Sequence, residues 1–364
     1  MNLRTTFDGL ILANPLMPAS GPLVGDLEKL MFMRDAGCGA VVTKTISSEL
    51  PDVPKPCIYG DRHFVMNSEL WSEHHYSLWK DRILPAYAEK KDRPLIISLG
   101  YKKEDMELLV PIFDRFADAF EISTHYVGTD LSVIERTVRT IRRHTEKPVY
   151  MKISPHIPDP AAFARAIKES GAQGVVAINS LGPTMKIDSR KRRIRYGNEQ
   201  GFAWTSGPAI KNLALATVYR IKQAEPSLTV IGVGGIASAD DVIEFLLAGA
   251  SAVQMLSAAL IKGKSLYQKI IADLPERLKE NGFMSVDDAI KTTLRSDVSY
   301  RASVPELIEK KCIRCNLCVD VCPYFAIEMK DVITFDADKC FECGLCVTKC
   351  PTGAIIMPDR EEER

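Results

Sequence analysis

Short apolar runs alternate with amphipathic stretches of helical period over roughly the first 260 residues of the chain. Strands buried on both faces are continuously apolar, whereas the helices that cover them are apolar on one face, so this alternation predicts βα units on a parallel sheet. The expected strands are Leu10–Leu12 with Leu16–Pro18, Ala40–Thr43, Leu95–Leu99, Ala119–Ser123, Val149–Ile153, Gly174–Ala177, Thr229–Val233 and Ala252–Met255. The expected helices include Asp26–Asp35, Lys103–Asp114, Ser132–Thr145, Pro160–Ser170, Pro208–Gln223 and Ser238–Ala248. Eight strand–helix repeats of this length favour a (β/α)8 barrel, the TIM-barrel fold, over an open Rossmann sheet.

Glycines and long connections divide this pattern. Three glycines each end a predicted helix and precede a strand, as residues in the left-handed conformation do: Gly37, Gly171 and Gly249. Two connections, Ser47–His75 and Leu181–Ser206, are too long for plain turns and are expected to be lids or binding loops. Phe283–Pro305 is predicted to be a helix and linker. We therefore expect two domains, a barrel over residues 1–300 and a smaller module over residues 301–364.

Eight of the ten cysteines lie in the smaller module, in two runs of the form C-x2-C-x2-C-x3-C that are each followed by proline. This is the run of bacterial two-cluster ferredoxins, in which the fourth cysteine of each set ligates the other cluster. We expect one 4Fe–4S cluster on Cys312, Cys315, Cys318 and Cys350, and a second on Cys340, Cys343, Cys346 and Cys322. Zinc sites use four ligands in pairs and do not explain two identical runs followed by proline.

Composition narrows the choice of partner and compartment. Lys+Arg and Asp+Glu both number 47, which indicates neither nucleic-acid nor membrane binding. The apolar content of 46% is that of a globular protein, and no apolar run reaches the roughly 18 residues of a membrane span. No signal peptide opens the chain, so we expect free thiols and a cytoplasmic protein.

Iron–sulfur clusters carry electrons one at a time, so the barrel is expected to hold a group that exchanges them in pairs, and a flavin is the usual converter. The expected electron partner is a ferredoxin or a separate NAD(P)H-oxidising flavoprotein subunit. The chain has no G-x-G-x-x-G fingerprint, so direct oxidation of NAD(P)H is not expected. We also expect a homo-oligomer that acts on a small molecule.

A phosphate site is predicted near the end of the barrel. Gly234 and Gly235 follow an apolar strand and precede a helix, where backbone N–H groups can face an anion. Ser257 follows the last strand, and Ser206 with Gly207 precedes another helix. Alone, the glycine pair could be a tight turn, but together these residues predict a phosphate site, which barrels often form after their last two strands.

The chain resembles a known family in a series of motifs that keep their order: Ala19-Ser20-Gly21, Thr43-Lys44-Thr45, Asn67-Ser68-Glu69-Leu70, Lys152, Asn179-Ser180, Ser206-Gly207-Pro208, Gly234-Gly235 and Ser257-Ala258. These are similar to the FMN-barrel signatures of dihydroorotate dehydrogenases. They resemble still more closely the flavin domain and C-terminal ferredoxin module of dihydropyrimidine dehydrogenases, over nearly the whole chain.

The resemblance implies FMN and a division of roles. Residues implied to bind FMN are Ala19, Ser20, Gly21, Lys44, Thr45, Lys152, Asn179, Ser206, Gly207, Gly234, Gly235 and Ser257, with both lysines near the ring and Gly207, Gly235 and Ser257 on the phosphate. Those implied to face the substrate are Asn67, Glu69, Asn179 and Ser180. A lysine at a strand end can stabilise an anionic reduced flavin, although a salt-bridged barrel lysine is the plainer interpretation of either one alone. For Asn67 and Glu69 the plainer interpretation is a solvated loop.

The chain departs from the family after the fourth strand. Members carry an Asn-rich Leu-Ser-Cys-Pro stretch there and a cysteine loop that moves a proton, but this chain has Ser123-Thr124-His125-Tyr126-Val127-Gly128 without cysteine. Imidazole and phenol both serve as general acids, so His125 and Tyr126, with Lys44 beside the flavin, are the expected catalytic residues. The alternative is that His125 packs at the barrel mouth and Tyr126 caps the core.

Three functions remain open. The first is oxidation or reduction of a CH–CH bond in a dihydropyrimidine- or dihydroorotate-like substrate. The second is reduction of an anionic unsaturated acid or acyl-CoA-type thioester, clamped by the basic run Lys186, Arg190, Lys191, Arg192, Arg193 and Arg195, which is otherwise a solvated face. The third is a non-catalytic electron-transfer subunit. Trp71, His74 and His75 could line the same pocket or form a surface cluster.

Overall fold

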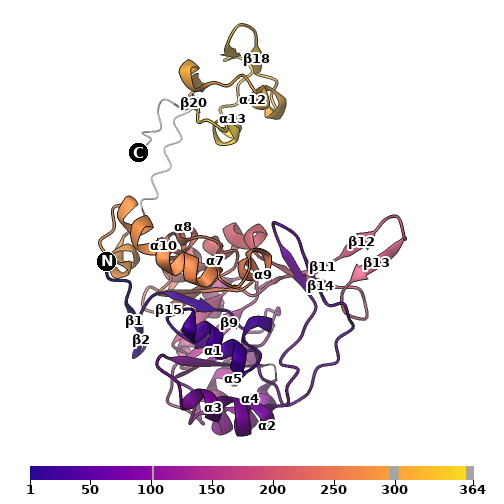
Figure 1. Ribbon diagram of the computed structural model, residues 1–364, viewed down its shortest axis with the longest axis vertical. Coiled ribbons are helices and arrows are strands. Elements are labelled where there is room, and N and C mark those ends of the chain that lie inside the picture. Colours follow the sequence, from indigo (N-terminus) through magenta and orange to yellow (C-terminus); the bar gives the residue numbers. More distant parts are fainter. Residues whose placement is uncertain (101, 295–302, 358–364) are drawn as a thin grey trace. The chain divides into compact units, whose positions relative to one another are not determined.

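The computed structural model describes residues 1–100, 102–294 and 303–357, and the chain divides into two compact units, Met1–Leu294 and Arg295–Arg364 (Figure 1). The expected boundary at residue 300 and the charged tail from Asp359 lie outside the described residues. Among the described residues, no helix is both long and apolar enough to span a membrane.

The first unit is the predicted eight-stranded parallel barrel. Its strands are hydrogen-bonded in the order β3-β16-β15-β10-β9-β8-β7-β4, and each neighbouring pair in this order is parallel. The amide of Gly39, just before β4, donates to the carbonyl of Leu16 in β3 at 2.9 Å, which brings the two edge strands together and nearly closes the barrel. The strands are β3 (Leu16–Pro18), β4 (Val41–Val42), β7 (Leu95–Leu99), β8 (Ala119–Ser123), β9 (Val149–Ile153), β10 (Gly174–Ala177), β15 (Thr229–Val233) and β16 (Ala252–Met255).

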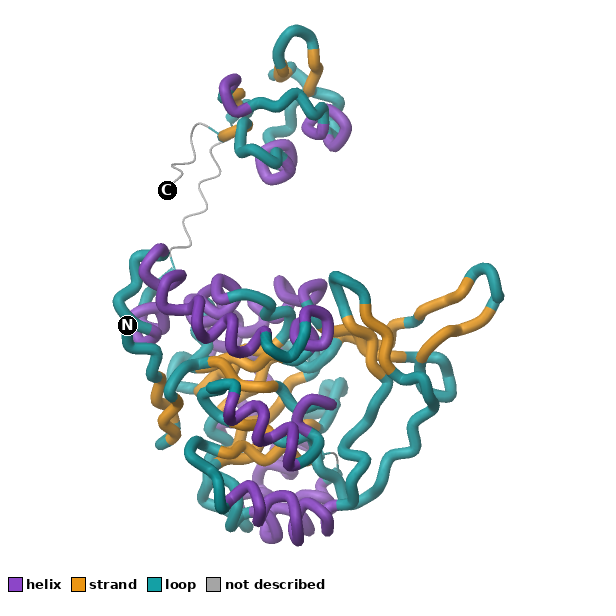
Figure 2. The backbone as a smooth tube through the Cα atoms, viewed as in Figure 1, coloured by secondary structure: helices purple, strands orange, loops and turns teal. Residues whose placement is uncertain are grey.

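Helices surround these strands (Figure 2). They are α1 (Leu27–Asp35), α2 (Tyr76–Leu78), the π-helical η2 (Trp79–Ile83), α3 (Leu84–Ala88), α4 (Lys103–Phe113), α5 (Ser132–Arg142), α6 (Pro160–Glu169), α7 (Lys211–Ala224), α8 (Ala239–Leu247), α9 (Ser257–Lys262), α10 (Leu266–Glu280) and α11 (Val286–Lys291), with 3-10 turns η1 (Pro22–Val24) and η3 (Pro208–Ile210). The predicted helix that starts at Pro208 begins instead with the 3-10 turn η3. The three predicted glycine caps are confirmed, with φ of +84°, +102° and +102° at Gly37, Gly171 and Gly249.

One strand prediction was wrong. Leu10–Leu12 was expected to run with Leu16–Pro18 in the barrel, but it is β2 of an antiparallel hairpin with β1 (Thr5–Phe7). Ile11 on this hairpin is half exposed while Leu10 and Leu12 are buried, so only one face of β2 packs on the protein. The period-two pattern of a half-buried strand separates it from the fully buried barrel strands.

The two long connections form strands rather than loops. β5 (Ile58–Gly60) and β6 (Val65–Asn67) come from the first, and β11 (Leu181–Thr184) and β14 (Ala203–Ser206) from the second. They combine into one antiparallel sheet in the order β11-β14-β6-β5. Between β11 and β14 the chain extends as a further hairpin of β12 (Lys186–Asp188) and β13 (Arg193–Tyr196), which projects in Figure 1.

The second unit is built from two similar halves. Its elements are β17 (Glu306–Leu307), η4 (Glu309–Lys311), α12 (Leu317–Val321), β18 (Ile327–Met329), β19 (Ile333–Phe335), α13 (Leu345–Lys349) and β20 (Ile355–Ile356). Each cysteine run uses three left-handed residues at equivalent positions: Arg314, Asn316 and Phe325 in the first, and Glu342, Gly344 and Gly353 in the second. The expected repeat in sequence is therefore also a repeat in backbone conformation.

A substitution at Gly39 tests the contact that nearly closes the barrel. A Cβ at this position would collide with the carbonyl oxygen of Asn14, a backbone atom that cannot rotate away. We predict that Gly39→Ala lowers the free energy of unfolding by about 1–3 kcal/mol, measured by urea denaturation. Gly60→Ala is the matched control, because the nearest atom to its Cβ is Val65 Cγ2 at 3.9 Å. Equal stability of the two variants would contradict the close approach.

Candidate active site

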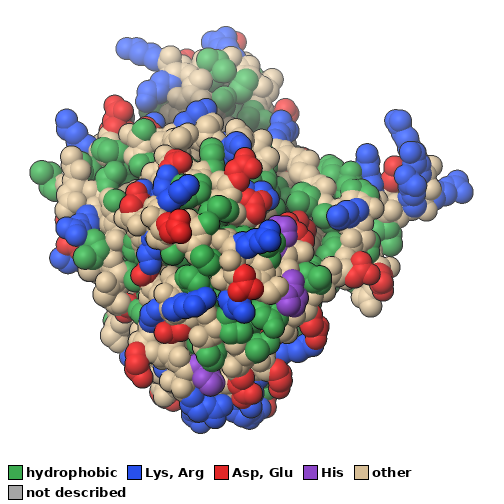
Figure 3. Space-filling model, turned by 60° about the horizontal axis from the view of Figure 1, so that its bottom comes forward, with side chains coloured by type: hydrophobic (Ala, Val, Ile, Leu, Met, Phe, Trp, Pro, Cys, Tyr) green, Lys and Arg blue, Asp and Glu red, His purple; other side chains and the backbone are tan. Residues whose placement is uncertain are grey.

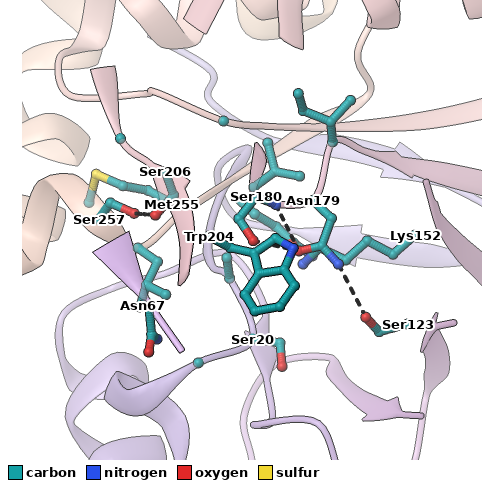
Figure 4. Close-up of a pocket in the computed structure, with 18 of the residues that line it drawn as sticks. Ser20, Asn67, Ser123, Lys152, Asn179, Ser180, Trp204, Ser206, Met255 and Ser257 are labelled. Carbon is teal, nitrogen blue, oxygen red and sulfur yellow. Dashed lines mark hydrogen bonds between the residues drawn. The ribbon is translucent and has the colours of Figure 1, made fainter. Parts of the chain in front are cut away.

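A cavity of about 430 Å³ opens at the carboxyl ends of the barrel strands. Sixteen of the seventeen predicted site residues line it, and Figure 4 shows several of them converging: Ala19, Ser20, Gly21, Lys44, Thr45, Asn67, Glu69, His125, Lys152, Asn179, Ser180, Ser206, Gly207, Gly234, Gly235 and Ser257. The one that does not line the cavity is Tyr126. The barrel explains this convergence, because parallel strands end at the same rim.

Glycines and hydroxyls occupy one end of the cavity. The hydroxyl of Ser257 donates to that of Ser206 at 2.7 Å, and Gly207 with φ +97° leads into η3 and α7. Gly235 has φ +83°, and a Cβ there would lie 2.6 Å from Lys211 Cβ and 2.8 Å from its backbone nitrogen. The backbone of Gly235 thus lies so close to the start of α7 that a side chain would collide there, and this glycine backbone, the helix start and the hydroxyls form a cradle that suits a phosphate group.

Lys44 follows β4 and is 3% exposed. Its Nζ lies 2.7 Å from Glu73 Oε2 and 3.4 Å from Glu69 Oε1. Partial burial, the largest single effect, raises the pKa of Glu73, but the hydrogen bond and charge of Lys44, a backbone hydrogen bond and the nearby His74 together outweigh it, so the pKa is lowered. Lys44 is therefore both a cavity residue and a salt-bridged barrel lysine, and the two interpretations of the sequence are not exclusive.

Lys152 in β9 forms a second, deeper ion pair. Its Nζ lies 3.1 Å from Glu121 Oε1 in β8, and Glu121 is fully buried. Gln254 in β16 donates from Nε2 to the other carboxylate oxygen of Glu121 at 2.6 Å. The carboxylate thus accepts bonds from two other barrel strands, which offsets part of the cost of burying its charge.

The residues present fit a flavin mononucleotide. Oε1 of Gln254 is buried and has no hydrogen-bond partner among the described residues, so it is an acceptor that faces a cavity and lacks a donor. The imide N–H of an isoalloxazine ring is such a donor, and Lys152 beside it can face the edge of the ring that becomes negative on reduction. The glycine–serine cradle at the other end suits the phosphate of the same molecule.

His125 lines the cavity from the segment that follows β8. Its backbone is left-handed, with φ +49°, a conformation that few non-glycine residues adopt and that turns the side chain to the cavity. Oδ1 of Asn179 accepts from the amide of Ser180 at 2.8 Å, so its Nδ2 faces His125 Nε2 at 3.2 Å. His125 Nε2 then accepts this bond, which requires a neutral imidazole.

The electrostatics agree with that protonation state. The imidazole is open to the cavity, but protein groups enclose it on the other sides, and this desolvation together with the charge of Lys152 lowers the pKa of His125 to about 4. Tyr126 is arranged differently: its hydroxyl donates to the carbonyl of Asp130 at 2.6 Å. Of the two expected proton-transfer residues, the structure brings only His125 to the cavity.

The antiparallel sheet of the two long segments forms another wall. Asn67 in β6 holds Glu69 by two bonds, from its Nδ2 to Oε2 at 3.2 Å and from the Glu69 amide to its Oδ1 at 2.7 Å. Both residues line the cavity, so neither is simply part of a solvated loop. The indole of Trp204 in β14 lines the cavity together with Asn179 and Ser180 (Figure 4). Trp71 also lines the cavity, whereas His74, His75 and all six cations of the basic run do not.

Sequence reasoning missed Glu121, Gln254, Glu73 and Trp204. The first two had a usable signal, because each is a charged or amide side chain inside an otherwise apolar strand of a predicted barrel. Such residues must find buried partners, and here they find each other. Glu73 and Trp204 had no comparable signal, since both lie in segments whose strand pairing the sequence does not reveal.

The cysteines of the second unit surround two small cavities. One is lined by Cys312, Cys315, Cys318 and Cys350, and the other by Cys322, Cys340, Cys343 and Cys346. Amides of Ala326, Glu342 and Ala354 donate to the sulfurs of Cys322, Cys340 and Cys350 at 3.2–3.4 Å. Within the described residues, no three His, Cys, Asp or Glu side chains converge closely enough for a single metal ion. Thiols spread around a void suit a larger cluster better than one zinc ion.

Comparison with known proteins agrees with both units. Residues 2–278 match the family model described as dihydroorotate dehydrogenase, and residues 311–354 match that described as 4Fe-4S dicluster domain. The chain is 33% identical to the dihydroorotate dehydrogenase B (NAD(+)), catalytic subunit, of Pyrococcus furiosus, over 80% of this chain and 98% of that protein. The proteins of the same name from Oceanobacillus iheyensis and Methanothermobacter thermautotrophicus are 32% and 29% identical, over 80% and 79% of this chain and 98% and 97% of theirs.

The match to the family model covers most of the chain and includes the whole barrel with its cavity. The chain belongs to the dihydroorotate dehydrogenase family and is a flavin-dependent oxidoreductase that acts on a CH–CH bond.

Proposed function

We propose that this enzyme binds FMN in the barrel cavity, moves a hydride between flavin N5 and a CH–CH bond of a small, neutral dihydropyrimidine, and exchanges electrons through two 4Fe–4S clusters. The observation that carries the proposal is that one cavity is lined both by the glycine–serine cradle of Gly207, Gly235 and Ser257 and by the amides of Asn67 and Asn179. Bound FMN would supply the hydride acceptor or donor and the step between paired and single electrons.

The charges around the cavity favour a neutral substrate. Both cavity lysines already face carboxylates, Lys44 those of Glu69 and Glu73 and Lys152 that of Glu121. Arginine, the side chain best suited to clamp a carboxylate, does not occur among the cavity-lining residues. Amide and hydroxyl groups of Asn67, Asn179 and Ser180 suit the alternating N–H and C=O edge of a pyrimidine ring, and Trp204 offers a face for a flat ring.

Two other substrates are less well supported. Dihydroorotate carries a carboxylate, and the support for it is that the relatives from three organisms are named dihydroorotate dehydrogenases. An anionic acid or acyl thioester would need the clamp of the basic run, and none of its side chains lines the cavity. A non-catalytic electron relay would not require the enclosed substrate end that Asn67, Glu69 and Asn179 surround.

Two clusters and a separate partner complete the proposal. Two cavities, each lined by three cysteines of one run and the fourth of the other, support the ligand sets expected from the spacing. The relatives are named catalytic subunits, which supports a distinct electron-exchanging partner for this chain. Eight free thiols held for clusters also support a reducing, cytoplasmic location.

Anaerobic flavin bleaching tests the substrate class. We predict that 5,6-dihydrouracil bleaches the oxidised flavin of the holoenzyme, and that dihydroorotate does so at least about tenfold less efficiently, because its carboxylate lacks a free cation. Stopped-flow absorbance measures both rates. Preferential bleaching by dihydroorotate would overturn the neutral-substrate proposal. If only an α,β-unsaturated acyl thioester restored colour to the reduced enzyme, the thioester reductase would be favoured.

His125 is proposed to take up the proton when the CH–CH bond is oxidised. With a pKa of about 4 its imidazole is already the base form at neutral pH, so kcat/KM for oxidation should fall only as the pH drops toward 4, and not near 6.5. We predict that His125→Gln lowers kcat between about 10²- and 10⁴-fold and removes this acid limb. His144→Gln, at an exposed position away from the cavity, is the control. Unchanged turnover in His125→Gln would exclude the role.

Metal analysis tests the clusters. We predict about eight iron and eight sulfide per chain, falling to about four of each in Cys315→Ser, because only one cluster loses a ligand. Cys57→Ser, outside both runs, should keep the full content. About four iron atoms per chain in the wild-type protein would mean that it holds only one cluster.

A further inference from the structure

The hairpin β12–β13 carries charge that the barrel does not use. Residues 186–196 are called the basic arm, and its cations are Lys186, Arg190, Lys191, Arg192, Arg193 and Arg195 against one carboxylate, Asp188. None of the six takes part in a salt bridge among the described residues. Residues 189–195 are all exposed, and Figure 3 shows the blue side chains of this arm gathered on a projection from the molecule. An overall neutral chain thus concentrates unpaired positive charge on one feature.

The arm is an ordered element rather than a solvated loop. Its strands pair from Lys186↔Tyr196 to Asp188↔Arg193, and Asp188 Oδ1 accepts from the amide of Lys191 at 3.0 Å across the turn. At its base the ammonium of Lys186 lies 5.2 Å from the ring centroid of Tyr59, which packs against Tyr196 at 5.2 Å. These contacts tie the arm to β5, so its charges are held in a defined arrangement.

An apolar pair lies between the charges. Ile187 and Ile194 are cross-strand partners, and they are 62% and 45% exposed. Large β-branched side chains left in solvent on a rigid strand pair, with cations around them, have the composition of a protein interface: a small apolar centre within a charged rim. A nucleic acid would use the charges but not the isoleucines.

The ligand of the arm is not the small substrate. No residue of the arm lines the cavity, yet the arm continues β11 and β14, and Trp204 and Ser206 of β14 are cavity residues. A macromolecule docked on the arm would therefore be held by the same sheet that walls the reaction site.

We propose that the basic arm is the docking surface for an acidic, one-electron iron–sulfur carrier protein. The inference rests on the proposed function, in which two reduced carriers each give one electron, two protons are taken up, a C=C bond becomes CH–CH and both carriers leave oxidised. A cubane with four thiolates is itself anionic, so its carrier meets a cationic surface favourably. Electron-transfer complexes are small and weak and depend on such steering for their rate of association.

Charge reversal tests the arm on the holoenzyme. Binding of a purified acidic 2[4Fe–4S] ferredoxin is measured by calorimetry at about 50 mM and 300 mM salt. We expect Arg190→Glu, Arg192→Glu and Arg193→Glu together to weaken binding at least about tenfold at low salt, and the same three changed to Lys to retain it. Reversal of Lys90, Lys269 and Lys279, which are also exposed and form no salt bridge among the described residues, makes the same change in net charge and should have little effect.

Further measurements distinguish a role of the arm in docking from a role in the reaction at the flavin. The arm variant should keep wild-type reoxidation of its chemically reduced flavin by uracil, and the double change Ile187→Ser with Ile194→Ser should weaken carrier binding without a change in its salt dependence. Equal affinity in the wild type, the arm variant and the control would overturn the proposal. The proposal would also be overturned if the arm variant lost binding to anionic vesicles or duplex DNA but bound the ferredoxin as tightly as the wild type. If uracil did not reoxidise the flavin of the wild-type enzyme, the proposed substrate would be contradicted instead.

Discussion

A buried ion pair organises the mouth of this barrel. Lys152, which lines the cavity, pairs with the fully buried Glu121 on the adjacent strand, and removing two charges from water is costly unless each is paired and hydrogen-bonded. Gln254 completes the arrangement from a third strand and is left with one unsatisfied acceptor. The charge of Lys152 also adds to the desolvation that lowers the pKa of His125 and keeps its imidazole neutral.

The rest of the site is arranged around this fixed charge by two different means. Parallel strands bring Lys44, Lys152 and the glycine cradle to one rim because all of them end there. The antiparallel sheet then adds Asn67 and Trp204 from segments that leave the barrel between strands. In the proposed function the barrel residues would hold the cofactor and the inserted sheet would contact the substrate, which is the part expected to differ between enzymes of one fold.

The barrel was predictable because its information is local. Fully buried strands such as Leu95–Leu99 are apolar throughout, and Gly171 and Gly249 mark helix ends by a backbone conformation that other residues avoid. The cysteine spacing was equally informative, since each run repeats the same left-handed positions. What the sequence could not reveal was pairing at a distance: Asn67 and Trp204 are partners across β6 and β14, and nothing near either residue indicates it. The prediction for β2 was wrong for a simpler reason: a short apolar run was taken for a barrel strand.

The account depends on the cavity being a flavin site, and the flavin content of the purified protein tests that most directly. Gly207, Gly235 and Ser257 line one cavity and form the single cradle proposed for a phosphate, so we expect about one FMN per chain, released intact on denaturation and identified by chromatography. Protein that is purified with its iron in place but without flavin, and that does not take up added FMN, would contradict the account.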